Sequence, residues 1–178
     1  NSIRCIAEDE QGNYYIGTSD ALSIVTISNG LKVRKTLQEI MYARSIAIGK
    51  AGDVAVVNNS GQLFIINNQM IKETFTLKTG NAETFYTCCK YMDNGDLLVG
   101  TTTNEMYRLR KTNGKYRTIK RYTTGNLQQI SSIASDDQGN YWVCSGSGIG
   151  YLQREKFHTF DTNTFNSSID NMTMDYQG

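Results

Sequence analysis

The chain has 178 residues, of which 39% are hydrophobic and 20% are charged, and its formal net charge at pH 7 is +1. This composition is that of a soluble globular protein with a sizeable core, and a net charge near zero argues against a general nucleic-acid-binding protein. No run of about eighteen apolar residues is present, so we expect membrane attachment only through segments outside this chain.

One eight-residue pattern occurs near both ends of the chain. Residues 9–16 read Asp-Glu-Gln-Gly-Asn-Tyr-Tyr-Ile, and residues 136–143 read Asp-Asp-Gln-Gly-Asn-Tyr-Trp-Val. Degenerate copies lie at residues 50–56 and 93–99, and a fifth copy begins at residue 175. The glycines of the copies stand at positions 12, 52, 95, 139 and 178, so the spacings are 40, 43, 44 and 39 residues. A spacing of about forty residues with strand-like sequence between the anchors is typical of an array of blades, here called blades one to four.

The anchor glycine of each copy is predicted to lie in a tight turn between two antiparallel strands, because glycine readily adopts the positive φ that such turns require. Asp9 and Asp136 precede their glycines by three residues and can accept hydrogen bonds from turn amides. Blade two carries Gly49 at that position, and blade three carries Asp93 one residue later. We therefore expect the turns of blades two and three to be less regular.

Blade one is predicted to contain four strands. Apolar or alternating segments lie at residues 2–7, 14–18, 22–27 and 31–37, and Asn29–Gly30 separates the last two. Asn-Gly between strands is a strong hairpin signal, because the favoured turn needs positive φ at both positions. Two hairpins in one repeat give a four-stranded antiparallel sheet, which is the layout of a β-propeller blade.

The other repeats follow the same plan. Their predicted strands are residues 44–48, 54–57, 63–66 and 71–77 in blade two, 85–92, 97–101, 106–109 and 116–122 in blade three, and 130–135, 141–145, 149–152 and 157–160 in blade four. The outer hairpin turns are expected at Asn67–Asn68, Asn113–Gly114 and Arg154–Glu155.

We therefore predict an all-β fold of four β-propeller blades and the first strand of a fifth. The blades are expected at residues 2–41, 42–80, 81–126 and 127–165, and the next blade is expected to start within residues 169–178. Because the sequence ends inside a turn, we expect a fragment of a larger propeller. An open arc would leave apolar blade faces uncovered at both ends, so we expect either self-association of two copies through those faces or a tight closure of four to five blades.

No catalytic residue, metal centre or cofactor is predicted. The four cysteines lack the Cys-x-x-Cys spacing of a zinc site, and the chain has one histidine, His158, outside any nucleophile motif. The turn carboxylates lack the late bidentate glutamate of a calcium loop. Buried free thiols are the favoured interpretation of Cys5, Cys88, Cys89 and Cys144.

Blade three carries a basic segment. Seven of the 18 basic residues fall within fourteen positions that contain no acid: Arg108, Arg110, Lys111, Lys115, Arg117, Lys120 and Arg121. These residues belong to the predicted outer hairpin, where basic side chains on an exposed strand edge prevent pairing between molecules. Edge protection is the favoured interpretation, and an anion-binding face is the alternative.

The repeat resembles the two-component regulator propeller repeat. Blade one carries the pattern at Ile3, Ile6, Asp9, Gly12, Asn13, Tyr14, Tyr15, Ile16, Gly17 and Thr18. Blade four carries it at Ile130, Ile133, Asp136, Gly139, Asn140, Tyr141, Trp142 and Val143, and departs from it at Cys144–Ser145. This resemblance implies the extracytoplasmic sensor propeller of a bacterial hybrid histidine kinase or membrane-bound diguanylate cyclase. It therefore implies a periplasmic or extracellular location in a membrane-anchored receptor.

Ligands of propellers bind at the mouth of the central channel, on two sets of loops. The loops between the second and third strands carry Asp20, Asn59, Asn104 and Ser147, and the connections to the next blade carry Tyr42, Arg44, Tyr86 and Gln129. Polar groups beside aromatic rings suit a glycan or another small polar ligand. We expect a non-catalytic ligand-binding sensor; the alternatives are a protein-binding scaffold and, less favoured, a propeller lyase or glycosidase.

Overall fold

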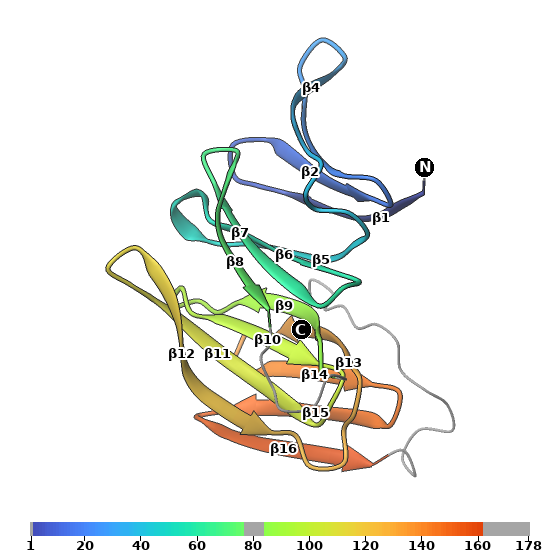
Figure 1. The fold of residues 1–178 in the computed structure, drawn as a ribbon. Coiled ribbons are helices and arrows are strands. Elements are labelled where there is room, and N and C mark those ends of the chain that lie inside the picture. The colour runs from blue at the N-terminus through green and yellow to red at the C-terminus, as the bar shows by residue number, and fades with distance from the viewer. Residues whose placement is uncertain (1, 77–83, 162–178) are drawn as a thin grey trace. The chain divides into compact units, whose positions relative to one another are not determined.

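The computed structural model of the chain describes residues 2–76 and 84–161 (Figure 1). The chain divides into two compact units, Asn1–Lys78 and Thr79–Gly178. Each unit contains two four-stranded antiparallel sheets, which confirms the all-β prediction. Among the described residues, no helix has the length and apolar character needed to span a bilayer. The fifth strand expected within residues 169–178 lies outside the described residues.

The first unit contains blades one and two. Blade one is the sheet β1 (Ile3–Glu8), β2 (Asn13–Thr18), β3 (Leu22–Ile27) and β4 (Leu31–Leu37), and blade two is β5 (Ala43–Ile48), β6 (Val54–Asn58), β7 (Gln62–Asn67) and β8 (Met70–Thr76). The strands of each blade pair in sequence order, and the first strands β1 and β5 lie side by side. Leu22 and Ile24 of blade one pack with Val54, Val56 and Phe64 of blade two in a shared core.

The second unit contains blades three and four. Blade three is β9 (Tyr86–Tyr91), β10 (Leu97–Thr101), β11 (Glu105–Thr112) and β12 (Lys115–Thr123), and blade four is β13 (Ile130–Ser135), β14 (Tyr141–Ser145), β15 (Gly148–Gln153) and β16 (Lys156–Asp161). The first strands β9 and β13 lie side by side, as β1 and β5 do in the first unit. Leu98 and Met106 of blade three pack with Ile130, Val143 and Leu152 of blade four.

The four anchor glycines within the described residues have positive φ, at 75° for Gly12, 76° for Gly52, 87° for Gly95 and 77° for Gly139. The turn of blade two is irregular as expected, because it forms a short 3-10 helix, Lys50–Gly52, in which Ala51 also has positive φ. The expectation for blade three was wrong. Its turn is closed by Gly95 N–H to Met92 O at 2.9 Å, which matches Gly12 N–H to Asp9 O at 3.1 Å in blade one. The backbone bonds and the Asn94 side chain, whose Oδ1 accepts a hydrogen bond from Asp96 N–H at 3.0 Å, hold this turn without the early aspartate.

The outer hairpin turns also match the prediction, with one shift. Asn29–Gly30, Asn113–Gly114 and Arg154–Glu155 have positive φ at both residues. In blade two the pair is Asn68–Gln69 instead of Asn67–Asn68, because Asn67 still pairs with Met70 in the ladder. The Asn67 side chain donates to Asp53 Oδ1 at 2.7 Å, which ties this residue to the sheet.

Every first strand contains a β-bulge at the same place. Ile3 and Cys5 pair with consecutive residues of β2, so one extra residue lies between them. The same register shift occurs in β5, β9 and β13. The extra residues are Arg4, Arg44, Thr87 and Ser131. Bulges of this kind change the direction of a side chain and are frequent beside functional sites.

Candidate functional site

The loop between the second and third strands of each blade is held by the last side chain of the second strand. Thr18 Oγ1 accepts hydrogen bonds from the N–H groups of Asp20 and Ala21, both at 3.2 Å. In blade two, Asn58 Oδ1 accepts one from Gln62 N–H at 2.9 Å. Thr101 and Ser145 make the corresponding contacts in the second unit. These loops are therefore tight turns rather than long open segments.

The connection to the next blade has a buried anchor followed by a strained residue. Ile40 and Leu127 are buried in corresponding positions of the two units, and each donates its N–H to the carbonyl three residues earlier. Two residues later, Tyr42 and Gln129 have φ of 52° and 53°. Positive φ is uncommon for bulky residues and persists only where the surroundings impose it.

The two loop sets meet through backbone hydrogen bonds. Tyr42 N–H donates to Ser19 O at 3.3 Å, and Gln129 N–H donates to Thr102 O at 3.2 Å. Asn59 N–H donates in turn to Tyr42 O at 3.0 Å. At one end of each unit, the loops that follow the second strands meet the connections between blades. We call this end the inner-strand end.

The inner-strand end of the first unit brings together four of the predicted residues. Asp20 and Asn59 are exposed on the loops, and Tyr42 is 49% exposed on the connection. Arg44 follows as the exposed bulge residue of β5. These four residues offer polar groups beside one aromatic ring.

Sequence reasoning missed Arg4, which belongs to the same group. Its guanidinium carbon lies 5.9 Å from the centroid of the Tyr42 ring, in a cation–π arrangement. A sequence signal was present, because Arg4 and Arg44 each stand eight residues before their anchor glycine. Residues at the same distance from the anchor glycine are expected at the same place in their blades. The structure confirms this, because Arg4 and Arg44 are both bulge residues.

In the second unit, three predicted residues lie at the corresponding end but support the backbone. Asn104 Nδ2 donates to Gly125 O at 3.2 Å, and Ser147 Oγ donates to Asn126 O at 3.0 Å. Gln129 holds the strained position described above, and its side chain is exposed. Asn104 and Ser147 therefore brace the interblade connection.

The structure places Tyr86 away from this surface. Tyr86 is 5% exposed, its ring stands edge-on to Tyr107 at 6.4 Å, and burial raises its pKa to about 12. Phe85, which is 41% exposed, takes the position of Tyr42 and Gln129, and its carbonyl accepts a hydrogen bond from Thr102 N–H at 2.9 Å. Phe85 stands ten residues before Gly95, as Tyr42 and Gln129 stand ten residues before Gly52 and Gly139, so the prediction of Tyr86 was one residue late.

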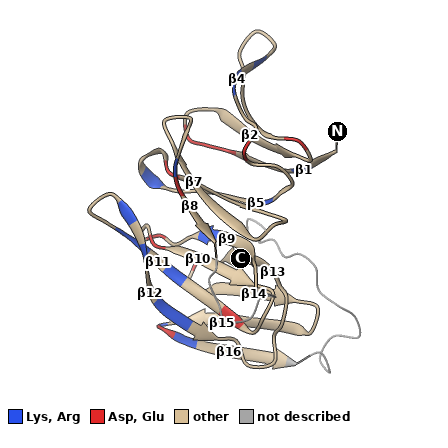
Figure 2. Ribbon diagram, viewed as in Figure 1, with Lys and Arg blue, Asp and Glu red and all other residues tan. Residues whose placement is uncertain are grey.

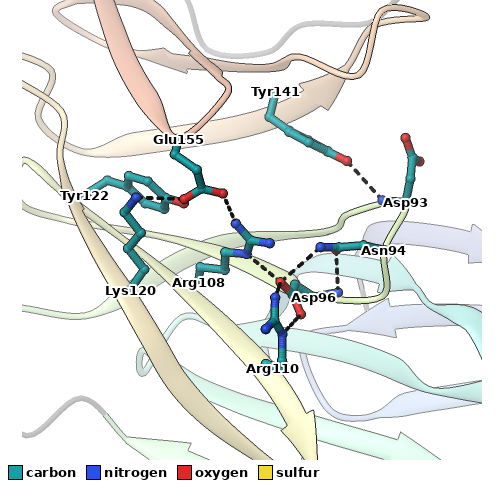
Figure 3. Close-up of polar contacts among 9 residues, drawn as sticks. All are labelled: Asp93, Asn94, Asp96, Arg108, Arg110, Lys120, Tyr122, Tyr141 and Glu155. Carbon is teal, nitrogen blue, oxygen red and sulfur yellow. Dashed lines mark hydrogen bonds and ion pairs between the residues drawn. The ribbon is translucent and has the colours of Figure 1, made fainter.

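The basic segment of blade three follows β11 and β12 (Figure 2). Four of its seven basic residues, Arg108, Arg110, Lys120 and Arg121, pair with acids. Asp96 accepts hydrogen bonds from Arg108 Nε at 2.5 Å and from Arg110 Nε at 2.8 Å (Figure 3). Glu155 of blade four pairs with Arg108 and with Lys120 Nζ, the latter at 2.7 Å. This network crosses from blade three to blade four, so it links the blades of the second unit.

Burial alone would raise the pKa of Asp96, but hydrogen bonds from Arg110 and Arg108 outweigh it, and the pKa lies below the ordinary value. Arg121 also pairs with Glu105, at 3.3 Å. The hairpin is thus a partly neutralised structural element, a weaker candidate for anion binding than its sequence indicated.

An aromatic hollow of about 520 Å³ lies on blade four. Trp142 and Phe160 stack there with ring centroids 6.5 Å apart, and Tyr151 lies beside both. Trp142 stands six residues after Asp136, as Tyr15 stands six residues after Asp9. Because Tyr15 is 5% exposed in the core that blade one shares with blade two, the equivalent face of blade four is best explained as an interblade face.

Residues 2–76 and 84–161 contain no cluster of three His, Cys, Asp or Glu side chains suited to a metal ion. The four cysteines are free thiols, and burial raises the pKa of Cys5 to about 11. His158 lies on β16, stacked on the Tyr151 ring with centroids 4.8 Å apart.

Comparison with known proteins agrees with this architecture. Residues 1–20 match the family model described as Two component regulator propeller. The resemblance found in blade one is thus confirmed. A search of curated proteins finds no significant match.

Solved structures match over most of the chain. The extracellular domain of a putative hybrid two component system from B. thetaiotaomicron matches with a TM-score of 0.80 and 20% identity, over 99% of this chain and 26% of that one. A second such domain from the same organism matches with a TM-score of 0.75 and 16% identity, over 100% of this chain and 24% of that one. A virginiamycin B lyase from Staphylococcus aureus matches with a TM-score of 0.69 and 14% identity, over 89% and 55%. At these identities the likeness shows the fold, a β-propeller array.

Proposed function

We propose that this chain is part of the extracytoplasmic sensor of a bacterial signal-transduction receptor. The observation that carries the proposal is the family match of residues 1–20, together with a structural likeness to a hybrid two component system that extends over 99% of the chain. The sensor binds an external ligand in the periplasm or outside the cell. A kinase or cyclase module elsewhere in the receptor produces the response.

The proposed ligand site is the inner-strand end of the first unit. Tyr42 presents a half-exposed ring there, and Asp20, Asn59 and the two bulge arginines surround it with hydrogen-bonding groups. A small number of polar groups around an aromatic surface is the usual composition of a site for a small polar ligand. Saccharides fit this composition, because their hydroxyl groups need donors and acceptors while their ring faces pack on aromatic side chains.

A thermal-shift screen of the whole extracytoplasmic protein tests this function. A ligand that binds the folded state alone raises the melting temperature as its concentration increases. We expect saccharides to raise it and short peptides to leave it unchanged. Stabilisation by peptides alone would support the protein-binding scaffold, and stabilisation by neither class would contradict ligand sensing.

A lyase is the second candidate, because virginiamycin B lyase shares the fold with a TM-score of 0.69. One structure of that enzyme is described as catalytically inactive after a histidine was replaced by alanine. The single histidine of the present chain, His158, lies in β16 and stacks on the Tyr151 ring. We therefore propose a non-catalytic role, and turnover of any stabilising compound would contradict it.

A further inference from the structure

We propose that Arg4 and Arg44 form a binding site for an acidic group, a carboxylate or a sulfate, carried by a saccharide that packs on Tyr42. This inference rests on the proposed sensor function and deepens it by naming the chemical class of the ligand. Four observations carry it: the shared bulge, the fixed position of Tyr42, the absence of acidic partners for the arginines among the described residues, and the loss of the arginines in the second unit.

The two arginines occupy the same position on neighbouring strands. Each is the bulge residue of a first strand, and β1 and β5 lie side by side. Gly17 of blade one lies against Ala43 of blade two, and a Cβ added to Gly17 would lie 2.6 Å from the Ala43 Cβ. Gly17 also faces Cys5. Cys5 follows Arg4 in the chain, and Ala43 precedes Arg44. The two bulges therefore flank one contact between the blades.

Tyr42 lies next to this contact and has a fixed backbone. Its N–H donates to Ser19 O at 3.3 Å and its carbonyl accepts from Asn59 N–H at 3.0 Å, so both blades hold it at a φ of 52°. Tyr42 is 49% exposed, and the Arg4 guanidinium carbon lies 5.9 Å from the centroid of its ring. One guanidinium and one aromatic face thus border the same space.

Within residues 2–76 and 84–161, no ion pair joins Arg4 or Arg44 to a carboxylate. The basic hairpin differs, because Arg108, Arg110, Lys120 and Arg121 each pair with an acid there. An exposed arginine without an acidic partner keeps its planar donors available, and these donors match the geometry of carboxylates and sulfates.

The arginine pair is specific to the first unit. The corresponding bulge residues of blades three and four are Thr87, which is buried, and Ser131, which donates to Cys144 O at 3.2 Å. Neither carries a charge. The positive charge at the bulge is therefore confined to the two blades that hold the exposed Tyr42 between them.

Isothermal titration calorimetry on the whole extracytoplasmic protein tests the proposal with three probes: trigalacturonic acid, a sulfated chondroitin disaccharide and neutral maltotriose. We expect at least one acidic probe to bind more tightly than maltotriose, and to bind more weakly as salt is raised. Binding of the first or of the second probe alone identifies the acidic group as a carboxylate or a sulfate.

The double variant Arg4→Gln/Arg44→Gln should weaken acidic binding roughly tenfold or more, since each lost charge-assisted bond carries a substantial part of the affinity. Both side chains are exposed, so the melting temperature should be unchanged. Arg117→Gln, an exposed arginine of β12, is the matched control and should bind normally. Equal binding of maltotriose and the acidic probes, or unchanged acidic binding in the double variant, would overturn the acidic site and leave the sensor function standing. Binding of no saccharide would overturn both.

Discussion

Trp142 donates a hydrogen bond from its indole Nε1 to Asp136 Oδ2 at 2.8 Å, and Tyr15 makes the same contact in blade one, from its hydroxyl to Asp9 Oδ2 at 3.3 Å. Each aspartate also accepts two backbone N–H groups of its turn, Gln138 and Asn140 in blade four. Burial would raise the pKa of Asp136, but these hydrogen bonds outweigh it and lower the pKa. One carboxylate thus closes the turn and fixes the aromatic ring of the next strand.

Replacement of Asp136 by alanine is expected to destabilise the fold by about 1–3 kcal/mol, because the turn amides and the indole lose an ionised acceptor. Chemical denaturation followed by Trp142 fluorescence gives the free energy of unfolding. Asp137→Ala, an exposed neighbour in the same turn, serves as the control and should change it little. Equal effects of the two substitutions would show that the carboxylate does not hold the turn.

Stability is expected to depend on pH through Glu155. Hydrogen bonding from Lys120, with further contributions from Tyr122 and Arg108, lowers the pKa of Glu155 from 4.5 to about 2. A carboxylate with a lowered pKa stabilises the fold above its unfolded-state pKa, and the contribution is lost as pH falls through the folded-state pKa. The free energy of unfolding should therefore decrease between pH 4.5 and about pH 2.

Denaturant titrations across this range should show a shallower decrease for Glu155→Gln than for the unchanged protein. Glu10→Gln, at an exposed position of the first turn, is the control and should keep the full slope. A variant at Glu155 with an unchanged slope would mean that the network of Figure 3 does not couple to folding.

Arg108 is expected to be the most sensitive member of that network. It is buried, it contacts Asp96 and Glu155, and its removal leaves the buried Asp96 with Arg110 as its remaining guanidinium partner. Removing one member of a buried ion pair costs about 3–5 kcal/mol of unfolding free energy. Because Arg110 still pairs with Asp96, we expect the loss in Arg108→Met to lie near the lower value. The control Arg117→Met, at an exposed position of β12, should change the free energy of unfolding little in the same denaturation assay. A similar loss of stability in both variants would show that the buried pair of Arg108 and Asp96 does not stabilise the fold.

Gly17 and Gly100 are expected to tolerate no side chain. A Cβ on Gly100 would lie 2.7 Å from Ile130 Cγ2 and 2.8 Å from Cys88 Sγ, and Gly17 faces Cys5 and Ala43 in the same way. Overpacking of this kind costs about 1–3 kcal/mol, so Gly100→Ala should lower the melting temperature. Gly146→Ala, where the added Cβ would meet nothing within 4 Å, should leave it nearly unchanged.

The sequence predicted the strands and turns well because both depend on local patterns. Alternating apolar residues and glycine or asparagine turns act within a few residues, and Asn29–Gly30 lies where that chemistry requires. Blade three was harder, since in its regular turn at Gly95 the Asn94 side chain replaces the early aspartate: its Oδ1 accepts a hydrogen bond from Asp96 N–H at 3.0 Å. The aspartate next to that glycine, Asp96, instead binds two arginines of β11, and such a pairing across strands is invisible in the spacing of the repeat.

The candidate site was predicted in part. Tyr42 and Arg44 follow from their distance to the anchor glycine, and the same count would have found Arg4. Tyr86 was assigned to the loop, and the structure puts Phe85 there instead; the same count would have selected Phe85, which stands ten residues before Gly95 as Tyr42 does before Gly52. Spacing does not show which of these side chains bind the backbone, as Asn104 and Ser147 do.

Hydrogen–deuterium exchange of the whole extracytoplasmic protein, with and without the saccharide that stabilises it, tests the central claim most directly. The account predicts slower exchange of amides at the inner-strand end of the first unit, in residues 2–5, 19–21 and 40–44, because a bound ligand closes the loops that Tyr42 joins. Protection confined to the β11–β12 hairpin or to the Trp142 face, with exchange at Tyr42 unchanged, would contradict it.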